Sequence, residues 1–425
     1  MLTPPTPNSS NSFTRREILG IPLAFAFAGI TRDSEAAERK KIATVITSYW
    51  RNSHADCFVT PLLEGYPFYG KFRNPRVQVV SMYTDQVPDN DMSRDMAARH
   101  GFTIYPTVRE TLTLGGKDLA VEGVVFIGEH GNYAWNIKGQ HLYPRYWLYK
   151  QIVDVFRQSG RSVPVFADKH FSYDWDEAKW MYDQSRELNF PLMAGTSLSL
   201  AWRRPPLELE LETPVEKAVF SFYGGKESYG FHALEGLQCM VERREGGETG
   251  IAAVQYIEGA PVWEWTDANP WAWRLLREGL SRCPECTPGS PCENVKIPML
   301  FIIEYNSGLK SAVYLLNGHT RYASFAADLR GSPEPVSTQI WLQWVRPWGH
   351  AYPLVYYIEK LIVNEQPSYP VERTLLTTGA LSALMDSAYK NGKRLETPHL
   401  NVVYRAQKES VFDRGQVPPP EKETK

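Results

Sequence analysis

Two side chains have the chemistry and the position needed to exchange a proton with a ligand. Lys169 follows an apolar run, 163–166, that predicts a buried strand, where an amine is poorly solvated. Desolvation favours the neutral amine, which can accept and return a proton. His232 opens a predicted helix, 232–243, and an imidazole titrates near neutral pH. Each also has a purely structural interpretation: a lysine paired with Asp168, and a histidine satisfied at its helix start.

Three of the five cysteines, Cys283, Cys286 and Cys292, lie in a loop rich in proline and glycine. A Cys-x-x-Cys pair with a third cysteine resembles part of a zinc site, but no fourth ligand is evident nearby. In an exported protein, a disulfide between two of them is equally consistent with the pattern. The sequence predicts a surface loop with a local disulfide or none, and no catalytic metal.

The composition is that of a globular protein and argues against binding to nucleic acid. Of the 425 residues 43% are hydrophobic, enough for a packed core, and the length favours two domains. The formal net charge of −2 lacks the excess of Lys and Arg that phosphate groups require. The 13 Trp and 23 Tyr indicate either ordinary packing or an aromatic pocket for a sugar-like ligand.

The N-terminus has the pattern of a targeting signal, assigned to residues 1–37. Arg15 and Arg16 precede a short apolar run, 20–30, and the small residues at 34–37 suit a signal peptidase. The paired arginines resemble a twin-arginine signal; the alternative is a chance pair before an amphipathic helix. The first interpretation predicts a periplasmic or extracellular protein, free of the membrane in its mature form and loaded with any cofactor before export.

Strands and helices alternate in the first half of the mature chain, 38–195. Apolar runs predict strands, and helical periodicity predicts helices. The strands are expected at 41–46, 77–82, 121–127, 163–166 and 191–195, and the helices at 93–100, 146–159 and 174–188. This pattern is typical of a Rossmann-like, doubly wound parallel sheet, whose ligands bind at the carboxyl ends of the strands. Glu129 and His130 follow one such end, although by themselves they favour a polar loop.

The second half, 196–405, is rich in strands that few helices separate. Strands are expected at 215–223, 251–257, 297–304, 311–316 and 337–345, and helices at 232–243, 271–282, 352–363 and 371–390. They predict an α+β domain with one large open, mainly antiparallel sheet. The charged, Pro-rich residues 406–425 have no core to join and predict a disordered tail.

Three stretches in register resemble the glucose-fructose oxidoreductase/inositol dehydrogenase (Gfo/Idh/MocA) family. Residues 163–170, Val-Pro-Val-Phe-Ala-Asp-Lys-His, are similar to the family's strand that ends in Glu-Lys-Pro. Residues 230–234, Gly-Phe-His-Ala-Leu, are similar to its Gly-x-His helix start, and residues 385–393 to its closing helix. The order and spacing agree over about residues 41–400.

The resemblance implies a Rossmann domain, a second α/β domain with an open sheet, and pairing into a dimer or tetramer through that sheet. It implies an NAD- or NADP-dependent oxidoreductase acting on a sugar, polyol or related hydroxyl compound. Lys169 and His232 would handle the alcohol proton, and the cofactor would carry the hydride. The residues expected to contact the cofactor are Thr47, Ser48, Tyr49, Arg51, Asp85, Glu129, His130 and Asp168.

The phosphate-binding loop departs from the family pattern. The family has Gly-x-Gly-x-x-Gly after its first strand, whereas residues 47–52 are Thr-Ser-Tyr-Trp-Arg-Asn. Side chains there would push the phosphates outward; Arg51 could then bind them directly, and Ser48 or Ser53 could donate hydrogen bonds. Asp85, which would hold a ribose hydroxyl, lies a few residues late and is equally consistent with a turn. The loop leaves open an oxidoreductase, a non-catalytic ligand-binding protein, and an NAD-assisted glycoside hydrolase or lyase.

Overall fold

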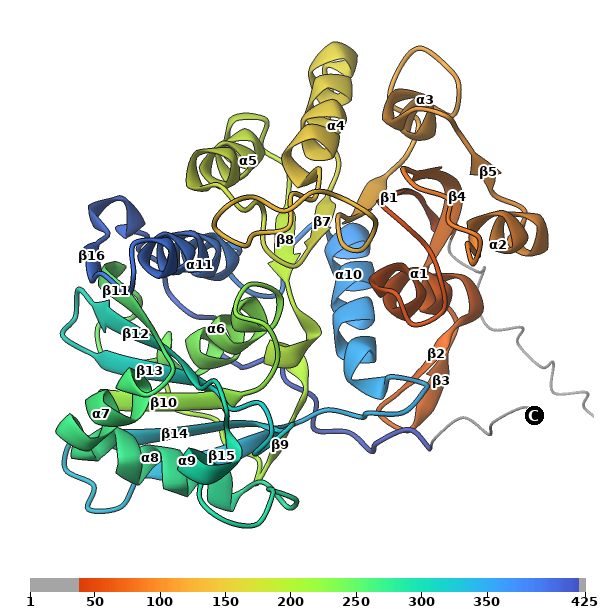
Figure 1. Cartoon of the computed structure of the whole chain (residues 1–425). Coiled ribbons are helices and arrows are strands. Elements are labelled where there is room, and N and C mark those ends of the chain that lie inside the picture. The colour runs from red at the N-terminus through yellow and green to blue at the C-terminus, as the bar shows by residue number, and fades with distance from the viewer. Residues whose placement is uncertain (1–37, 420–425) are drawn as a thin grey trace, which may run out of the picture. The chain divides into compact units, whose positions relative to one another are not determined.

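The computed structural model describes residues 38–419, so the predicted signal lies outside the described residues. The first half forms a six-stranded parallel sheet in the order β5-β4-β1-β6-β7-β8 (Figure 1). Its strands are β1 (Lys40–Ile46), β4 (Val77–Thr84), β5 (Thr103–Ile104), β6 (Gly123–Ile127), β7 (Val165–Asp168) and β8 (Leu192–Gly195). The order runs outward in both directions from β1 and β6, which confirms the predicted doubly wound sheet.

Helices cover both faces of this sheet because its strands are apolar on both sides. The helices of the first half are α1 (His54–Glu64), α2 (Ser93–His100), α3 (Val108–Thr113), α4 (Arg145–Ser159) and α5 (Trp175–Glu187). Side chains of α3, α4 and α5 share one core with Ala43 and Val45 of β1. Ile42 and Ile46 point to the other face, where α1 lies beside α10 (Tyr352–Asn364) (Figure 1). One face of the first sheet is therefore covered in part by α10, which lies far beyond the domain boundary predicted at residue 195.

The second sheet has eight strands in the order β16-β11-β12-β13-β10-β14-β15-β9. Its strands are β9 (Trp202–Arg204), β10 (Val215–Phe222), β11 (Ile251–Glu258), β12 (Met299–Tyr305), β13 (Lys310–Leu315), β14 (Ala323–Leu329), β15 (Val336–Trp341) and β16 (Leu395–Glu396). Neighbouring strands are antiparallel except β10 and β13, which are parallel. The predicted large, mainly antiparallel sheet is confirmed.

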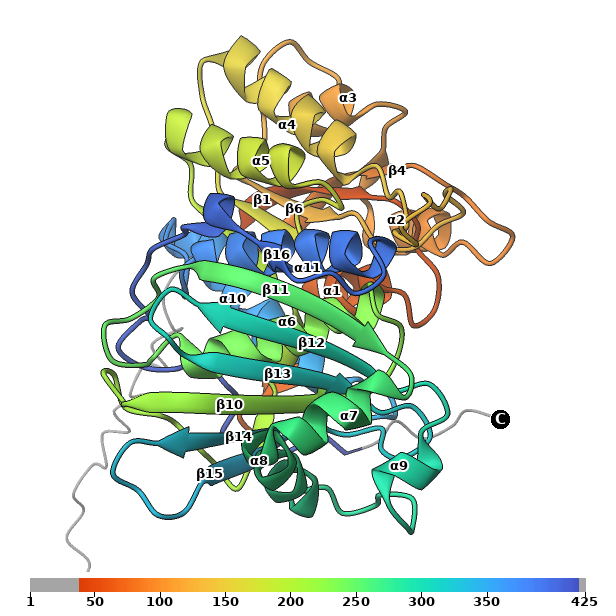
Figure 2. The ribbon, with the colours of Figure 1, turned by 60° about the vertical axis from the view of Figure 1, so that its left-hand side comes forward.

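Alternate residues of the second sheet pack against different helices, as the two-residue repeat of a strand requires. Phe301 and Ile303 share a core with α6 (Ser228–Val241) and α11 (Glu372–Tyr389). Leu300 and Ile302 of the same strand are buried with side chains of α7 (Pro261–Ala268) and α8 (Pro270–Ser281), which lie in front of the sheet in Figure 2. The face expected to pair with a second copy is thus covered by two helices of its own chain. Assembly into a dimer or tetramer stays a prediction.

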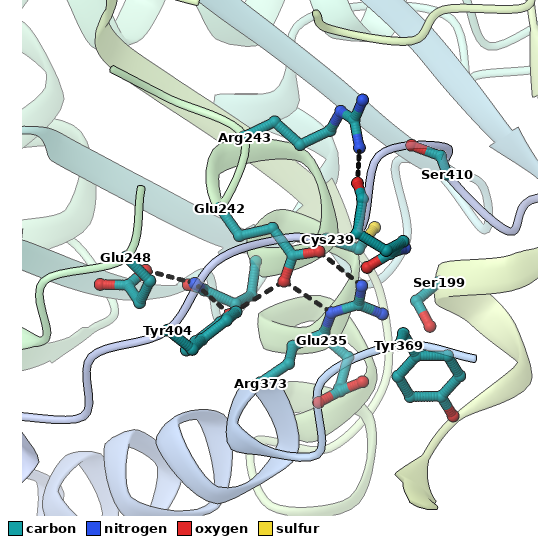
Figure 3. A network of polar contacts seen from close by, with 12 residues as sticks. Ser199, Glu235, Cys239, Glu242, Arg243, Glu248, Tyr369, Arg373, Tyr404 and Ser410 are labelled. Atoms are coloured by element: carbon teal, nitrogen blue, oxygen red, sulfur yellow. Dashed lines mark hydrogen bonds and ion pairs between the residues drawn. The ribbon is translucent and has the colours of Figure 1, made fainter. Parts of the chain in front are cut away.

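A buried polar network joins α6 to α11 (Figure 3). The Arg373 Nε donates to Glu242 Oε2 over 2.8 Å, and the Tyr404 hydroxyl donates to the same oxygen over 2.9 Å. Burial alone would lower the pKa of Arg373, but the adjacent Glu242 carboxylate holds it well above its ordinary value. About two turns before Glu242, Glu235 of α6 accepts a 2.7 Å hydrogen bond from Thr377 of α11. The two helices are therefore held in register by charge as well as by apolar contact.

Two segments differ from the sequence prediction. Residues 66–73 form a hairpin of β2 (Tyr66–Phe68) and β3 (Lys71–Arg73), which the sequence analysis does not predict. The tail, expected to be disordered over 406–425, packs against the chain over its described part: Asp413 N donates to Leu200 O over 2.8 Å, and Phe412 is buried. Hydrogen bonds from Arg243 to Gln407 O and from Trp202 to Gly415 O also hold this segment.

Candidate functional site

A pocket of about 400 Å³ lies where the carboxyl ends of the first-sheet strands meet the start of α6. Its polar lining includes His54, Glu129, His130, Lys169, Thr196 and His232, and its aromatic lining includes Trp135, Tyr143, Tyr229 and Trp344. The two residues that the sequence predicts as catalytic, Lys169 and His232, therefore come from different halves of the chain and line one pocket. Mixed aromatic and polar walls suit a small ligand with several hydroxyl groups.

Lys169 follows β7 directly and has a left-handed backbone, with φ of +59°. Its Nζ lies 2.8 Å from Glu129 Oε1 and its side chain is 4% exposed. Glu129 also binds the buried Arg145 guanidinium. Burial alone would raise the pKa of Glu129, but the Lys169 and Arg145 cations hold it well below its ordinary value. Glu129 is therefore paired with two buried basic side chains where it lines the pocket, and its contact with a cofactor stays a prediction.

Asp168, the last residue of β7, binds a histidine that the sequence analysis does not single out. Its Oδ2 lies 2.6 Å from Nδ1 of His54, the first residue of α1, and its side chain is 1% exposed against 22% for His54. Ser53 begins α1 as N-cap by accepting the Asp56 backbone N–H. The sequence feature that could point to His54 is its position at the start of the first helix, directly after the turn that follows β1.

His232 lies in the first turns of α6, with Nδ1 2.6 Å from the Thr196 hydroxyl. Burial lowers the pKa of His232 well below its ordinary value, and the nearby Lys169 and His54 add to this effect. The imidazole is therefore neutral, as a proton acceptor must be. Its ring centroid lies 6.4 Å from that of His54.

A second cluster of buried charged side chains adjoins the pocket, which Glu227 lines. His170 Nε2 lies 3.0 Å from Arg145 Nη1 and 3.5 Å from Glu227 Oε1. Burial alone would raise the pKa of Glu227, but the adjacent His170 lowers it.

His130 also lines the pocket, and its ring centroid is 5.0 Å from that of His54. Burial and the nearby His54 lower the pKa of His130 to about 3.

The structure places the predicted loop residues away from the pocket. The Thr47 hydroxyl donates to Glu129 O over 2.6 Å, and Ser48 is buried. The Tyr49 ring belongs to the apolar core, with its hydroxyl 2.7 Å from that of Thr60. Arg51 is exposed. None of these four side chains lines the pocket that contains Lys169 and His232.

A segment of the second half covers the turn where a pyrophosphate would bind. In dinucleotide-binding folds the pyrophosphate lies at the N-terminus of the first helix. Here Arg346 Nη1 lies 2.6 Å from Asp56 Oδ2, in the first turn of α1, and Trp348 Nε1 donates to Asn52 Oδ1 over 3.0 Å. The Asp56 carboxylate also accepts the Asn52 backbone N–H over 2.8 Å. An anionic side chain with a cationic partner already occupies this helix end, so these residues do not fit a pyrophosphate in the usual pose.

Asp85, expected to hold a ribose hydroxyl, follows the end of β4 and is exposed. Its two carboxylate oxygens accept hydrogen bonds from Tyr83 and Tyr133 over 2.7 and 2.6 Å. Each of these oxygens can accept a further hydrogen bond, so the role of Asp85 toward a ribose stays a prediction. The side chain thus ties β4 to the loop after β6.

The cysteine loop holds free thiols. All five cysteines are unpaired in the structure, and Cys283 lies within hydrogen-bonding reach of Cys286. Over residues 38–419, no group of three or more His, Cys, Asp or Glu side chains is arranged to hold a metal ion.

Comparison with known proteins identifies the fold. No family model and no curated protein matches the sequence. Among solved structures, GenD2 from gentamicin A biosynthesis, in complex with NAD, is similar with a TM-score of 0.53 and 14% identity, over 86% of this chain and 99% of that one. A myo-inositol dehydrogenase from Lactobacillus casei, in complex with NAD(H) and myo-inositol, gives 0.52 and 10%, over 88% and 100%. One from Corynebacterium glutamicum gives 0.50 and 10%, over 84% and 98%.

At these identities the likeness shows the fold. The chain has the two-sheet fold of dehydrogenases that include myo-inositol dehydrogenases, which is the fold that the Gfo/Idh/MocA resemblance predicts. Activity has to be argued from the site, because one fold hosts many chemistries.

Proposed function

We propose that the chain is an enzyme that acts on a small carbohydrate-like hydroxyl compound and that Lys169 and His232 exchange the proton of its reacting hydroxyl group. The observation that carries the proposal is that both residues line one pocket, each held there by a buried partner. The aromatic side chains of the pocket offer flat apolar faces to the carbon skeleton of a sugar.

The two residues have different roles. His232 is neutral and bound through Nδ1 to Thr196, so its ring is oriented and able to accept a hydroxyl proton. Lys169, whose Nζ is paired with Glu129, donates a hydrogen bond to the oxygen that loses the proton and exchanges a proton with it. Together they would lower the free energy of an alkoxide in the pocket.

In the oxidoreductase form of this proposal, NAD or NADP accepts the hydride. Its support is the fold, since GenD2 and the Lactobacillus casei enzyme were solved with NAD or NAD(H). The residues at the start of α1 do not fit the pyrophosphate in the usual pose, so no step of the mechanism is assigned to a dinucleotide. The alternative of a non-catalytic ligand-binding protein is favoured by this same turn, and an activity assay separates the two.

The test is Lys169→Met, with Lys150→Met as its matched control. Lys150 lies on α4, where it pairs with Asp154 at the surface. A panel of hexoses, pentoses and inositols is incubated with the protein, with and without NAD(P), and followed by NMR. We expect Lys169→Met to keep its fold and lose at least about a hundredfold in turnover, while the control is unchanged. Equal turnover in both variants, or ligand binding by the wild-type chain without turnover, would contradict the enzyme proposal.

We also propose that the mature protein acts outside the cytoplasm. The support is Arg15-Arg16 before a short apolar run, and these residues lie outside the described ones. None of the helices that residues 38–419 form is long and apolar enough to cross a membrane.

A further inference from the structure

We propose that His54, oriented by Asp168, is a general base of this pocket and that the protein uses it without a dinucleotide, to move a proton at the carbon next to a carbonyl group. The proposal rests on the pocket and the substrate class of the proposed function. It goes beyond that function by naming a further catalytic residue and a redox-neutral reaction. Three parts of the structure carry it: the His54–Asp168 pair, the charged groups around His54, and the turn before α1, whose side chains pair with a segment of the second half.

The first part is the geometry of the pair. A carboxylate bound to Nδ1 of a histidine fixes the tautomer, leaves Nε2 as the basic nitrogen and stabilises the imidazolium that forms. Asp168 Oδ2 lies 2.6 Å from His54 Nδ1, and the carboxylate is almost fully buried while the imidazole lines the pocket. Its second oxygen, Oδ1, has no hydrogen-bond partner within the described residues. The carboxylate therefore acts mainly on His54.

The second part is the set of charges around His54. Lys169 is next to Asp168 in the chain and lines the same pocket, with its Nζ 2.8 Å from Glu129 Oε1. Proton abstraction beside a carbonyl needs a base for the C–H group and a positive charge for the oxygen that becomes an enolate. His54 and Lys169 are these two groups. His232, neutral and close to both, serves to pass a proton between neighbouring oxygens.

The third part is the turn that replaces the glycine-rich loop. The Arg346–Asp56 ion pair and the Trp348–Asn52 hydrogen bond connect a segment of the second half to the first turn of α1. A pyrophosphate at this helix end would meet the Asp56 carboxylate, which is 1% exposed and carries the same sign of charge. Binding would require an ion pair and a hydrogen bond to break before any phosphate contact forms. The chain thus fills the phosphate site with its own side chains.

The step balances without an oxidant. His54 Nε2 takes the proton from C2 of a 2-hydroxy aldehyde, the C–H electron pair forms a C1–C2 double bond, and the carbonyl pair moves to O1 beside Lys169. His232 transfers the C2 hydroxyl proton to O1, and the electron pair left on O2 re-forms a carbonyl as C1 takes back the proton from His54. C1 is reduced as C2 is oxidised, so the product is the isomeric ketose and every group of the protein returns to its starting state.

The experiment follows solvent deuterium into carbon-bound positions. The full mature chain is incubated in D2O with D-glucose, D-xylose, D-fructose and dihydroxyacetone, without added nucleotide, and the products are analysed by NMR. His54→Gln removes the base, and His100→Gln, on the far helix α2, is the control. We expect exchange by the wild type and the control, and a loss of at least about a hundredfold in His54→Gln. Asp168→Asn should lower kcat with little change in KM, because Asp168 positions the base and does not touch the substrate.

The outcomes separate this inference from the proposed function. Exchange that persists in His54→Gln, or no exchange with any of the four probes, overturns the inference. So does stoichiometric NAD(P) released from the denatured wild-type protein, a measurement that does not depend on any variant folding. Turnover that needs NAD(P) and is lost in Lys169→Met would overturn the inference and leave the proposed function standing. Turnover unaffected by Lys169→Met would count against both, because Lys169 has a role in each.

Discussion

Glu235 offers the sharpest prediction about stability, because it is a carboxyl group buried without a cation of its own. Oε1 accepts hydrogen bonds from Thr374 and Thr377, and Oε2 has no partner within the described residues. Burial raises the pKa of Glu235 to about 7, against an opposing effect of the nearby Arg373. Glu235→Gln replaces the carboxyl with a neutral group of the same shape. The neutral variant therefore mimics the protonated form at every pH.

The sign and size of the effect follow from linkage. The folded-state pKa of about 7 lies above the ordinary value of 4.5, so the folded chain binds this proton more tightly than the unfolded chain does. The stability that it contributes is complete below about pH 4.5 and is lost as the pH rises through about 7. Between pH 5 and 8 the loss is on the order of 2–3 kcal/mol. Glu235→Gln should be free of this loss.

Equilibrium urea unfolding, followed by tryptophan fluorescence at several pH values, measures the effect. The quantity of interest is the free energy of unfolding of Glu235→Gln minus that of the wild type, because other titrating groups cancel in this difference. It should become more favourable to the variant by about 2–3 kcal/mol from pH 5 to pH 8. Glu264→Gln, an exposed change on α7, is the control and should show no such trend. A difference that is constant with pH, or that moves against the variant, would refute the reasoning.

Three further changes have defined outcomes. Arg15→Lys with Arg16→Lys should keep the precursor in the cytoplasm, measured by immunoblot of cell fractions; unimpaired export would exclude the twin-arginine assignment. Cys283 holds the pKa of Cys286 down to about 7, so the pair should form a disulfide under mild oxidant, detected as the loss of two hydrogens by peptide mass spectrometry; two free thiols after treatment would argue against it. Tyr404→Phe removes a donor to a buried carboxylate and should lower the free energy of unfolding by about 1–2 kcal/mol, whereas an unchanged urea midpoint would show that the bond contributes nothing net.

Most of the fold could be predicted from local patterns. The strand expected at 41–46 is found at Lys40–Ile46 because it is a short continuous apolar run, and the helix expected at 371–390 is found at Glu372–Tyr389, where a long segment without proline is buried on most sides. β14, Ala323–Leu329, is not predicted, since its small side chains and aspartate give a weak signal and its neighbours in the sheet supply the pairing. A local sequence pattern also cannot predict which element a helix packs against: α10 is correctly expected as a helix, but its packing on the first sheet is not predicted.

The site could be predicted only in part. Lys169 and His232 are recognisable because each lies at the end or start of a predicted element, and the structure brings both to the pocket. His54 is missed because the turn before it lacks the glycines that mark such a loop, so that helix start is not evident. The roles of Glu129 and Asp168 as partners of Lys169 and His54 depend on contacts between segments far apart in the chain. The spacing of residues along the sequence does not reveal contacts of this kind.

The position of α10 has a consequence for how the protein is made. Ile42, Val125 and Phe166 of the first sheet are covered by a helix that begins at Tyr352. During synthesis only α1 covers this face, and the part beneath α10 stays exposed until most of the chain has left the ribosome; an exposed apolar surface of this kind attracts other chains. A fragment that stops at residue 195 should therefore precipitate rather than fold. The nascent protein will depend on chaperones for longer than one whose domains are completed in sequence.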